Sequence, residues 1–204
     1  MRRRLGLAAA VLVAVVAGVG SASALVGNTG RETLDGPQAV QPDGQGASLA
    51  TSAADPGGRQ PWAVRVYRSQ AGLTCPEAGR TQGGDFGRVD ADGRFQPLDI
   101  QAAGSCADLS EAPLSLAVNH FPARDPAGSG RAVIFGVVSP RITGLTLSLA
   151  GGRRPLAVNR GAFLAVTDED QLQGASLDAT FADGSTTSYP LRPSAAPATA
   201  PAGE

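Results

Sequence analysis

Length, composition and charge already exclude several kinds of chemistry. The chain has 204 residues, with 17 arginines, no lysine, 18 acidic residues, one histidine and two cysteines. This length allows one domain or two small ones. Without lysine there is no Schiff base, no Ser-Lys dyad and no phosphate-loop lysine. One histidine excludes a multi-histidine metal site, and two cysteines exclude a four-thiolate zinc or iron–sulfur site.

The N-terminus has the pattern of an export signal. Three arginines at positions 2–4 precede an apolar run over residues 5–19, and small residues follow at 20–24. A charged start, an apolar stretch and a small-residue site are typical of a secretory signal. We predict cleavage after Ala24, which leaves Leu25 as the first mature residue.

An uncleaved anchor is the alternative for this signal segment, residues 1–25. Residues 5–26 are 22 residues without a charge, about enough to span a bilayer. With either fate the rest of the chain is expected outside the cytoplasm, secreted or held in the cell envelope by one N-terminal helix. After cleavage, 14 arginines and 18 acidic residues give a net charge of −4. We therefore expect no nucleic-acid partner, and membrane contact only through the N-terminal segment.

The segments that flank the aromatic residues are poor in large apolar side chains. Residues 26–60 contain seven glycines, three prolines and no aromatic residue, and residues 193–204 are rich in proline and alanine. Such segments bury too little apolar area to offset the entropy of ordering them. We predict a disordered linker over 26–60, a folded unit over 61–192 and a disordered tail over 193–204.

Within the folded unit the apolar residues recur with a period of two, which indicates strands. Residues 62–68, 145–149 and 177–181 alternate, whereas Arg131–Val138 is a nearly continuous apolar run typical of a strand covered on both faces. The only helix candidates are short, at residues 107–112 and 168–172.

Turn residues separate these runs and predict hairpins. Asp90–Gly93, Gly151–Gly152 and Asp183–Gly184 each supply residues that tolerate positive φ. About eight to ten short strands indicate an all-β fold, either an antiparallel β-sandwich or two small β-subdomains. The second possibility divides the unit into residues 61–125 and 130–192, at a long loop predicted over residues 119–131.

The second half resembles a pattern in uncharacterised exported β-rich proteins of high-GC bacteria. The similar residues lie between 134 and 184, in the segments 134–140, 145–147, 155–159, 161–166 and 181–184. The resemblance implies a β-rich domain behind a signal or anchor. It implies no activity and no site residues.

Cys75 and Cys106 predict a structural disulfide. An even number of cysteines in an exported protein usually means a bridge. Their separation of 31 residues corresponds to about 3.5 kcal/mol of stabilisation in the chain-entropy model. A redox pair and two free thiols are the alternatives, although redox pairs are normally Cys-x-x-Cys.

The remaining candidates for chemistry each have an ordinary structural interpretation. His120, the only histidine, is expected in a loop, and no Gly-x-Ser-x-Gly nucleophile elbow accompanies it. The acidic clusters at 168–170 and 90–92 lack a full Ca²⁺ loop pattern, and we interpret them as a helix start and a solvated turn. The glycine-rich residues 83–87 are expected to form a loop.

We likewise expect Arg153 and Arg154 to lie at a solvated hairpin tip. Trp62, Tyr67 and Phe95 are expected to pack in the core rather than to form a ligand platform.

Taken together, these features predict an exported, envelope-associated module that binds an envelope or extracellular macromolecule or has a structural role. We expect no catalytic residues, no metal and no cofactor. The alternative is a hydrolase of envelope polymers that uses carboxylates such as Asp168, Glu169 and Asp85.

The cysteine pair gives the first testable prediction. Mass spectrometry of the exported, unreduced protein is expected to show a peptide crosslinked between Cys75 and Cys106, because both thiols lie outside the cytoplasm. Quantitative alkylation of both cysteines without prior reduction would contradict the bridge.

Overall fold

The computed structural model describes residues 40–90, 92–100, 106–121 and 130–191. The predicted export segment, the first part of the predicted linker and the predicted C-terminal tail lie outside the described residues. Among the helices in these described ranges, none is long and apolar enough to cross a membrane.

The described chain is built from antiparallel strands, as the period of two predicts. Five strands form a first sheet in chain order: β1 (Pro42–Ala53), β2 (Trp62–Ser69), β3 (Thr74–Gln82), β4 (Asp85–Val89) and β5 (Phe95–Pro97). The second sheet has the order β10-β11-β7-β6, with β6 (Leu114–Phe121), β7 (Arg131–Val138), β10 (Val158–Asn159) and β11 (Ala162–Asp168). The third has the order β13-β12-β8-β9, with β8 (Ile142–Leu149), β9 (Gly152–Leu156), β12 (Ser176–Phe181) and β13 (Thr186–Pro190).

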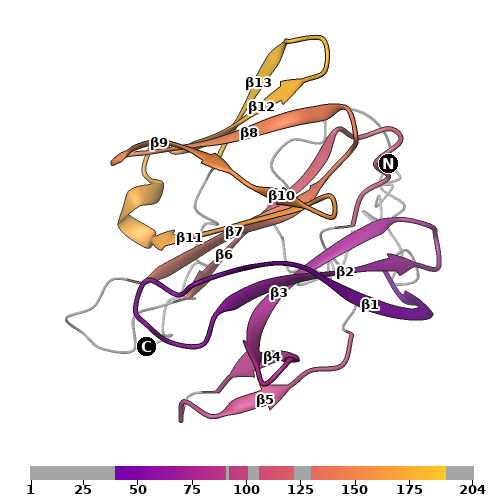
Figure 1. Cartoon of the computed structure of the whole chain (residues 1–204), viewed down its shortest axis with the longest axis vertical. Coiled ribbons are helices and arrows are strands. Elements are labelled where there is room, and N and C mark those ends of the chain that lie inside the picture. Colours follow the sequence, from indigo (N-terminus) through magenta and orange to yellow (C-terminus); the bar gives the residue numbers. More distant parts are fainter. Residues whose placement is uncertain (1–39, 91, 101–105, 122–129, 192–204) are drawn as a thin grey trace, which may run out of the picture.

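The three sheets are stacked as layers, with the second sheet in the middle (Figure 1). On one face of the middle sheet, Ile134 and Phe163 pack with the inner residues of β8 and β12. On the other face, Val133 and Leu164 pack with Trp62 and its neighbours on β2. Alternate residues of one strand therefore enter two different cores, because successive side chains point to opposite faces.

The strand β7 is covered on both sides, as its continuous apolar run predicts. Every residue of β7 after Arg131 is buried. Gly136 lies where the neighbouring strands β6 and β11 crowd β7, since a Cβ there would lie 1.9 Å from the Ser115 carbonyl oxygen and 2.7 Å from the Phe163 ring. A larger residue at position 136 would push the middle sheet apart.

The prediction of a disordered linker is wrong for residues 42–60. This segment forms β1, which pairs antiparallel with β2, and the buried Asp55 follows it. The low apolar content of this segment suggested disorder, but β1 is an edge strand with a mostly exposed surface. Its order comes from the pairing with β2 rather than from its own apolar residues. The folded unit therefore begins before residue 61.

The possible division into residues 61–125 and 130–192 is also wrong. The strands β6 and β7 lie on opposite sides of that boundary and pair along their whole length, from Leu114 with Val138 to Phe121 with Arg131. The predicted loop over residues 119–131 is correspondingly shorter, since its first three residues belong to β6.

Of the two short helix candidates, residues 107–112 begin with an isolated β-bridge between Ala107 and Thr74 and continue as a turn, and 168–172 contains the 3-10 helix η1 (Glu169–Leu172). The three predicted hairpin turns are confirmed, between β4 and β5, β8 and β9, and β12 and β13.

Two polar clusters fasten the first sheet. In one, the Asp55 carboxylate accepts a hydrogen bond from Trp62 Nε1 at 3.0 Å and pairs with Arg80 at 2.5 Å. The Arg80 guanidinium stacks on the Trp62 ring at 3.6 Å, and the Trp62 ring contacts Phe121 at 4.6 Å. This cluster joins the loop after β1 to β2, β3 and β6.

The second cluster covers the outer face of the first sheet. Arg65 pairs with Glu77 at 2.8 Å and donates hydrogen bonds to the carbonyl oxygens of Leu98 and Asp99. The predicted disulfide is confirmed, with the Cα atoms of Cys75 and Cys106 4.1 Å apart. Together these contacts hold the chain on either side of residues 101–105 against β2 and β3.

The Asp55 cluster predicts acid sensitivity. Burial raises the pKa of Asp55, but hydrogen bonds from Gly57, Arg80 and Trp62 and the charge of Arg80 outweigh it and lower the pKa below its ordinary value. A carboxylate with a lowered folded-state pKa stabilises the fold above its unfolded pKa, and this stability disappears as pH falls below about 4.

We expect Asp55→Ala to lower the free energy of unfolding by about 3 kcal/mol at pH 7, because it removes the carboxylate that neutralises the buried Arg80 guanidinium. Chemical denaturation at pH 7 and pH 3 measures both effects. The difference between the wild type and the variant should shrink at pH 3, and a difference independent of pH would contradict the ionised pair.

Candidate functional site

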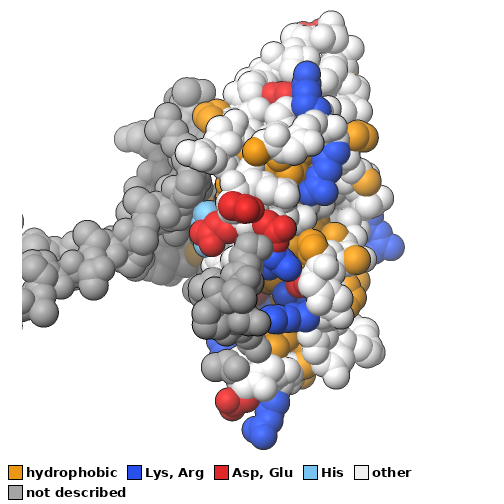
Figure 2. Space-filling model, turned by 90° about the vertical axis from the view of Figure 1, so that its left-hand side faces the viewer, with side chains coloured by type: hydrophobic (Ala, Val, Ile, Leu, Met, Phe, Trp, Pro, Cys, Tyr) orange, Lys and Arg blue, Asp and Glu red, His pale blue; other side chains and the backbone are white. Residues whose placement is uncertain are grey.

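His120 does not lie in a loop, as we predicted, but on β6, where it pairs with Ala132 of β7. Its Nδ1 lies 2.9 Å from Glu169 Oε1, and its Nε2 is buried without a hydrogen-bond partner in the described part of the chain. Figure 2 shows the histidine, in pale blue, beside a group of red acidic side chains.

A histidine that is oriented by a carboxylate is one part of a nucleophilic triad. The second requirement, a hydroxyl within hydrogen-bond distance of His120 Nε2, is not met among the described residues. The Glu169 side chain is 45% exposed, so this carboxylate lacks the buried setting in which it would hold an imidazolium most strongly. The pair is best explained as a contact between β6 and η1.

The acidic residues of the predicted hydrolase site are dispersed into separate structural roles. Asp168 pairs with Arg131 across β7 and β11, and Glu169 pairs with His120. Asp85 lies exposed at the start of β4, in the first sheet. Asp168 and Glu169 are thus close only because they are consecutive in the sequence. Asp85 lies in a different layer.

The turn carboxylates have the structural roles that their positions predict. Asp90 accepts hydrogen bonds from the Arg94 backbone N–H and the Gln96 side chain. Asp183 accepts hydrogen bonds from the Ser185 hydroxyl and backbone N–H, and these lower the pKa of Asp183 below its ordinary value. In the described residues, no group of three histidine, cysteine or acidic side chains is arranged to hold a metal ion.

The other predicted positions are confirmed in part. Gly83 and Gly84 form a turn with positive φ, but Asp85–Gly87 belongs to β4. Arg153 and Arg154 are exposed beside the hairpin turn, as predicted, but they belong to β9, where Arg153 pairs with Asp178 and Arg154 donates to the Val166 carbonyl oxygen. Trp62 and Tyr67 are buried as expected, whereas Phe95 is only half-buried.

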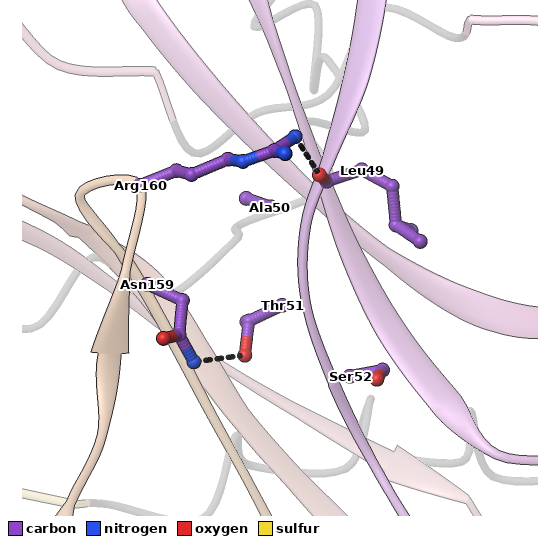
Figure 3. A pocket seen from close by; sticks show the side chains of 6 residues that line it. All are labelled: Leu49, Ala50, Thr51, Ser52, Asn159 and Arg160. Atoms are coloured by element: carbon purple, nitrogen blue, oxygen red, sulfur yellow. Dashed lines mark hydrogen bonds between the residues drawn. The ribbon is translucent and has the colours of Figure 1, made fainter.

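An open depression of about 470 Å³ lies between β1 and the turn that joins β10 to β11. We call it the β1–hairpin depression, and it is lined by Leu49, Ala50, Thr51, Ser52, Asn159 and Arg160. Figure 3 shows Asn159 and Arg160 reaching from the hairpin toward β1. The site therefore joins the edge of the first sheet to the edge of the middle sheet.

Two hydrogen bonds hold the hairpin over β1. Asn159 Nδ2 donates to Thr51 Oγ1 at 3.2 Å, and Arg160 donates to the Leu49 carbonyl oxygen at 3.1 Å (Figure 3). The strand β1 is interrupted by an irregularity between Leu49 and Thr51, which leaves backbone groups at this edge without a regular ladder. The Arg160 side chain covers one of them.

The hairpin turn itself is unusual in its choice of residues. Asn159 pairs with Ala162, so Arg160 and Gly161 form a two-residue loop, with φ values of 50° and 74°. Such a loop normally has asparagine, aspartate or glycine at its first position, because other side chains are strained at positive φ. Arg160 is the one non-glycine residue with positive φ in the described part of the chain.

Comparison with known proteins finds no match to a family model, to a curated protein or to a solved structure. The site must therefore be interpreted from its own geometry.

Sequence reasoning missed the β1–hairpin depression. Thr51 lies in the predicted linker, and Arg160 was not singled out because a lone arginine beside a glycine is not a recognised motif. The available signal was the sequence Asn159-Arg160-Gly161 between two apolar runs, which marks a turn. Nothing local indicates that this turn lies over β1.

His120 gives a testable prediction. We expect His120→Ala to lower the free energy of unfolding by about 1 kcal/mol, because its partner Glu169 is exposed. Chemical denaturation at pH 7 measures this change, with Glu169→Gln as the matched variant that removes the same pair from the other side. A lost biological activity in His120→Ala with an unchanged thermal midpoint would instead assign His120 a functional role.

Proposed function

We propose that the chain is an exported, envelope-associated β-rich module that binds a partner at the β1–hairpin depression and is not itself an enzyme. The disulfide between Cys75 and Cys106 supports an oxidising compartment, since such bridges persist outside the cytoplasm. The signal-like N-terminus and the resemblance over residues 134–184 favour the same location.

The observation that carries the proposal is the construction of the depression. Two separate sheets contribute to it, and a strained arginine is held across it by a hydrogen bond to β1. Strained backbone persists only where the surrounding structure enforces it, and it is concentrated at functional sites. The depression is open and shallow, which suits recognition of a surface or a chain end more than enclosure of a reacting substrate.

A carboxylate hydrolase is supported less well. Its three suggested residues, Asp168, Glu169 and Asp85, lie on two layers, and two of them are paired with Arg131 and His120. A pair of catalytic carboxylates has to face one substrate bond from defined positions.

Site-specific photocrosslinking tests the proposed binding surface. A photoreactive phenylalanine at position 49 should form a discrete adduct in cells that export the full chain, because the Leu49 side chain is 46% exposed beside the depression. The matched control is the same amino acid at position 188, since Ser188 is exposed on β13 of the outer sheet. No adduct from position 49, or the same adducts from both positions, would contradict the proposal.

A further inference from the structure

We infer that the ligand of the β1–hairpin depression carries a carboxylate next to an aliphatic group, and that Arg160 binds this carboxylate. The inference rests on the proposed function, because it assigns a ligand class to the same surface. It follows from the excess of hydrogen-bond donors, from the conformation of Arg160 and from the apolar side chains around it.

Hydrogen-bond donors outnumber acceptors in the depression. The Arg160 guanidinium has five N–H groups, and one of them donates a hydrogen bond to the Leu49 carbonyl oxygen. Asn159 donates one of its two N–H groups to Thr51 Oγ1, and the Thr51 hydroxyl hydrogen is left to donate as well. No acidic side chain lines the depression, so the positive charge of Arg160 is not neutralised there.

An anion with several acceptor positions would satisfy these donors and neutralise the charge of Arg160 together. A carboxylate fits, since its two oxygens accept parallel hydrogen bonds from the planar guanidinium fork. The neighbouring hydroxyl and amide donors would add direction to this contact. A neutral amide in the same place offers only one acceptor oxygen and leaves the charge of Arg160 unneutralised.

The conformation of Arg160 argues that its charge has a use beyond the turn. Asparagine at this position would suit the positive φ better and would still form the hairpin. Backbone strain of this kind is concentrated at functional sites. The hydrogen bond to the Leu49 carbonyl oxygen holds the guanidinium against β1 (Figure 3).

Apolar groups next to the donors specify the rest of the ligand. Leu49, which lines the depression, is 46% exposed and is one of the three exposed large apolar residues in the described chain. Ala50 adds a small apolar lining. An aliphatic group attached to the carboxylate would therefore remove apolar surface from water on the β1 side of Arg160.

Small probes test this recognition directly on the exported chain. In a two-dimensional amide NMR titration, N-acetylvaline is expected to shift the signals of residues 49–52 and 159–161 saturably in the millimolar range, and N-acetylvalinamide is not. N-acetylglutamic acid α-amide carries its carboxylate on a side chain. Tighter binding of N-acetylvaline identifies a chain terminus as the natural source of the carboxylate. Tighter binding of N-acetylglutamic acid α-amide identifies an acidic side chain.

Arg160→Asn separates binding from folding. It removes the charge but keeps a residue that suits the turn, so its thermal midpoint should equal or exceed that of the wild type, while the dissociation constant for N-acetylvaline rises at least about fivefold. Arg141→Asn is the matched control, because Arg141 is also exposed and also donates to a backbone carbonyl, that of Glu111. Binding should be unchanged in this control.

Several results would overturn the inference. The first is equal shifts from N-acetylvaline and N-acetylvalinamide, and the second is shifts from inorganic phosphate alone. The third is a lowered thermal midpoint of Arg160→Asn with unchanged binding, because Arg160 would then serve only to cover β1. If the position-49 adduct forms but no acid binds, the carboxylate inference fails and the binding surface stands. If an acid binds but no adduct forms, the proposed function fails.

Discussion

The burial of the middle sheet on both faces is the constraint on which the rest of the structure depends. Because β7 and β11 have no exposed face, both neighbouring sheets must remain in place for the apolar residues of these strands to leave water. Gly136 lets β6 and the Phe163 ring approach β7 closely. A change that loosens either outer sheet therefore exposes one of the two cores, and the layers are expected to unfold together.

The first sheet contributes few large apolar side chains, and polar contacts compensate for this. The ion pair of Asp55 with Arg80, the Arg65 cluster and the disulfide each tie a loop to a strand. These contacts are buried, so each is costly to break from one side only. They also fix the position of β1, because Asp55 follows β1 directly, and with it one wall of the β1–hairpin depression.

The depression shows why a site can be invisible to local reasoning. Its two walls are more than a hundred residues apart in the chain, and they meet only because the first sheet packs on the middle sheet. Arg160 has an unfavourable backbone conformation, yet it is held over β1 by a hydrogen bond to Leu49. A residue with a strained backbone, whose side chain links two layers, is the feature from which a binding role is inferred.

Much of the architecture followed from the sequence itself. The period of two and the turn residues predicted strands and hairpins, the apolar run predicted the doubly covered β7, and the cysteine count predicted the disulfide, because each depends on local chemistry or on simple counting. The order of β1, the pairing of β6 with β7, the role of His120 and the β1–hairpin depression were decided by tertiary structure. An edge strand with small polar residues is ordered by its neighbour, and a site between layers exists only after the layers have packed.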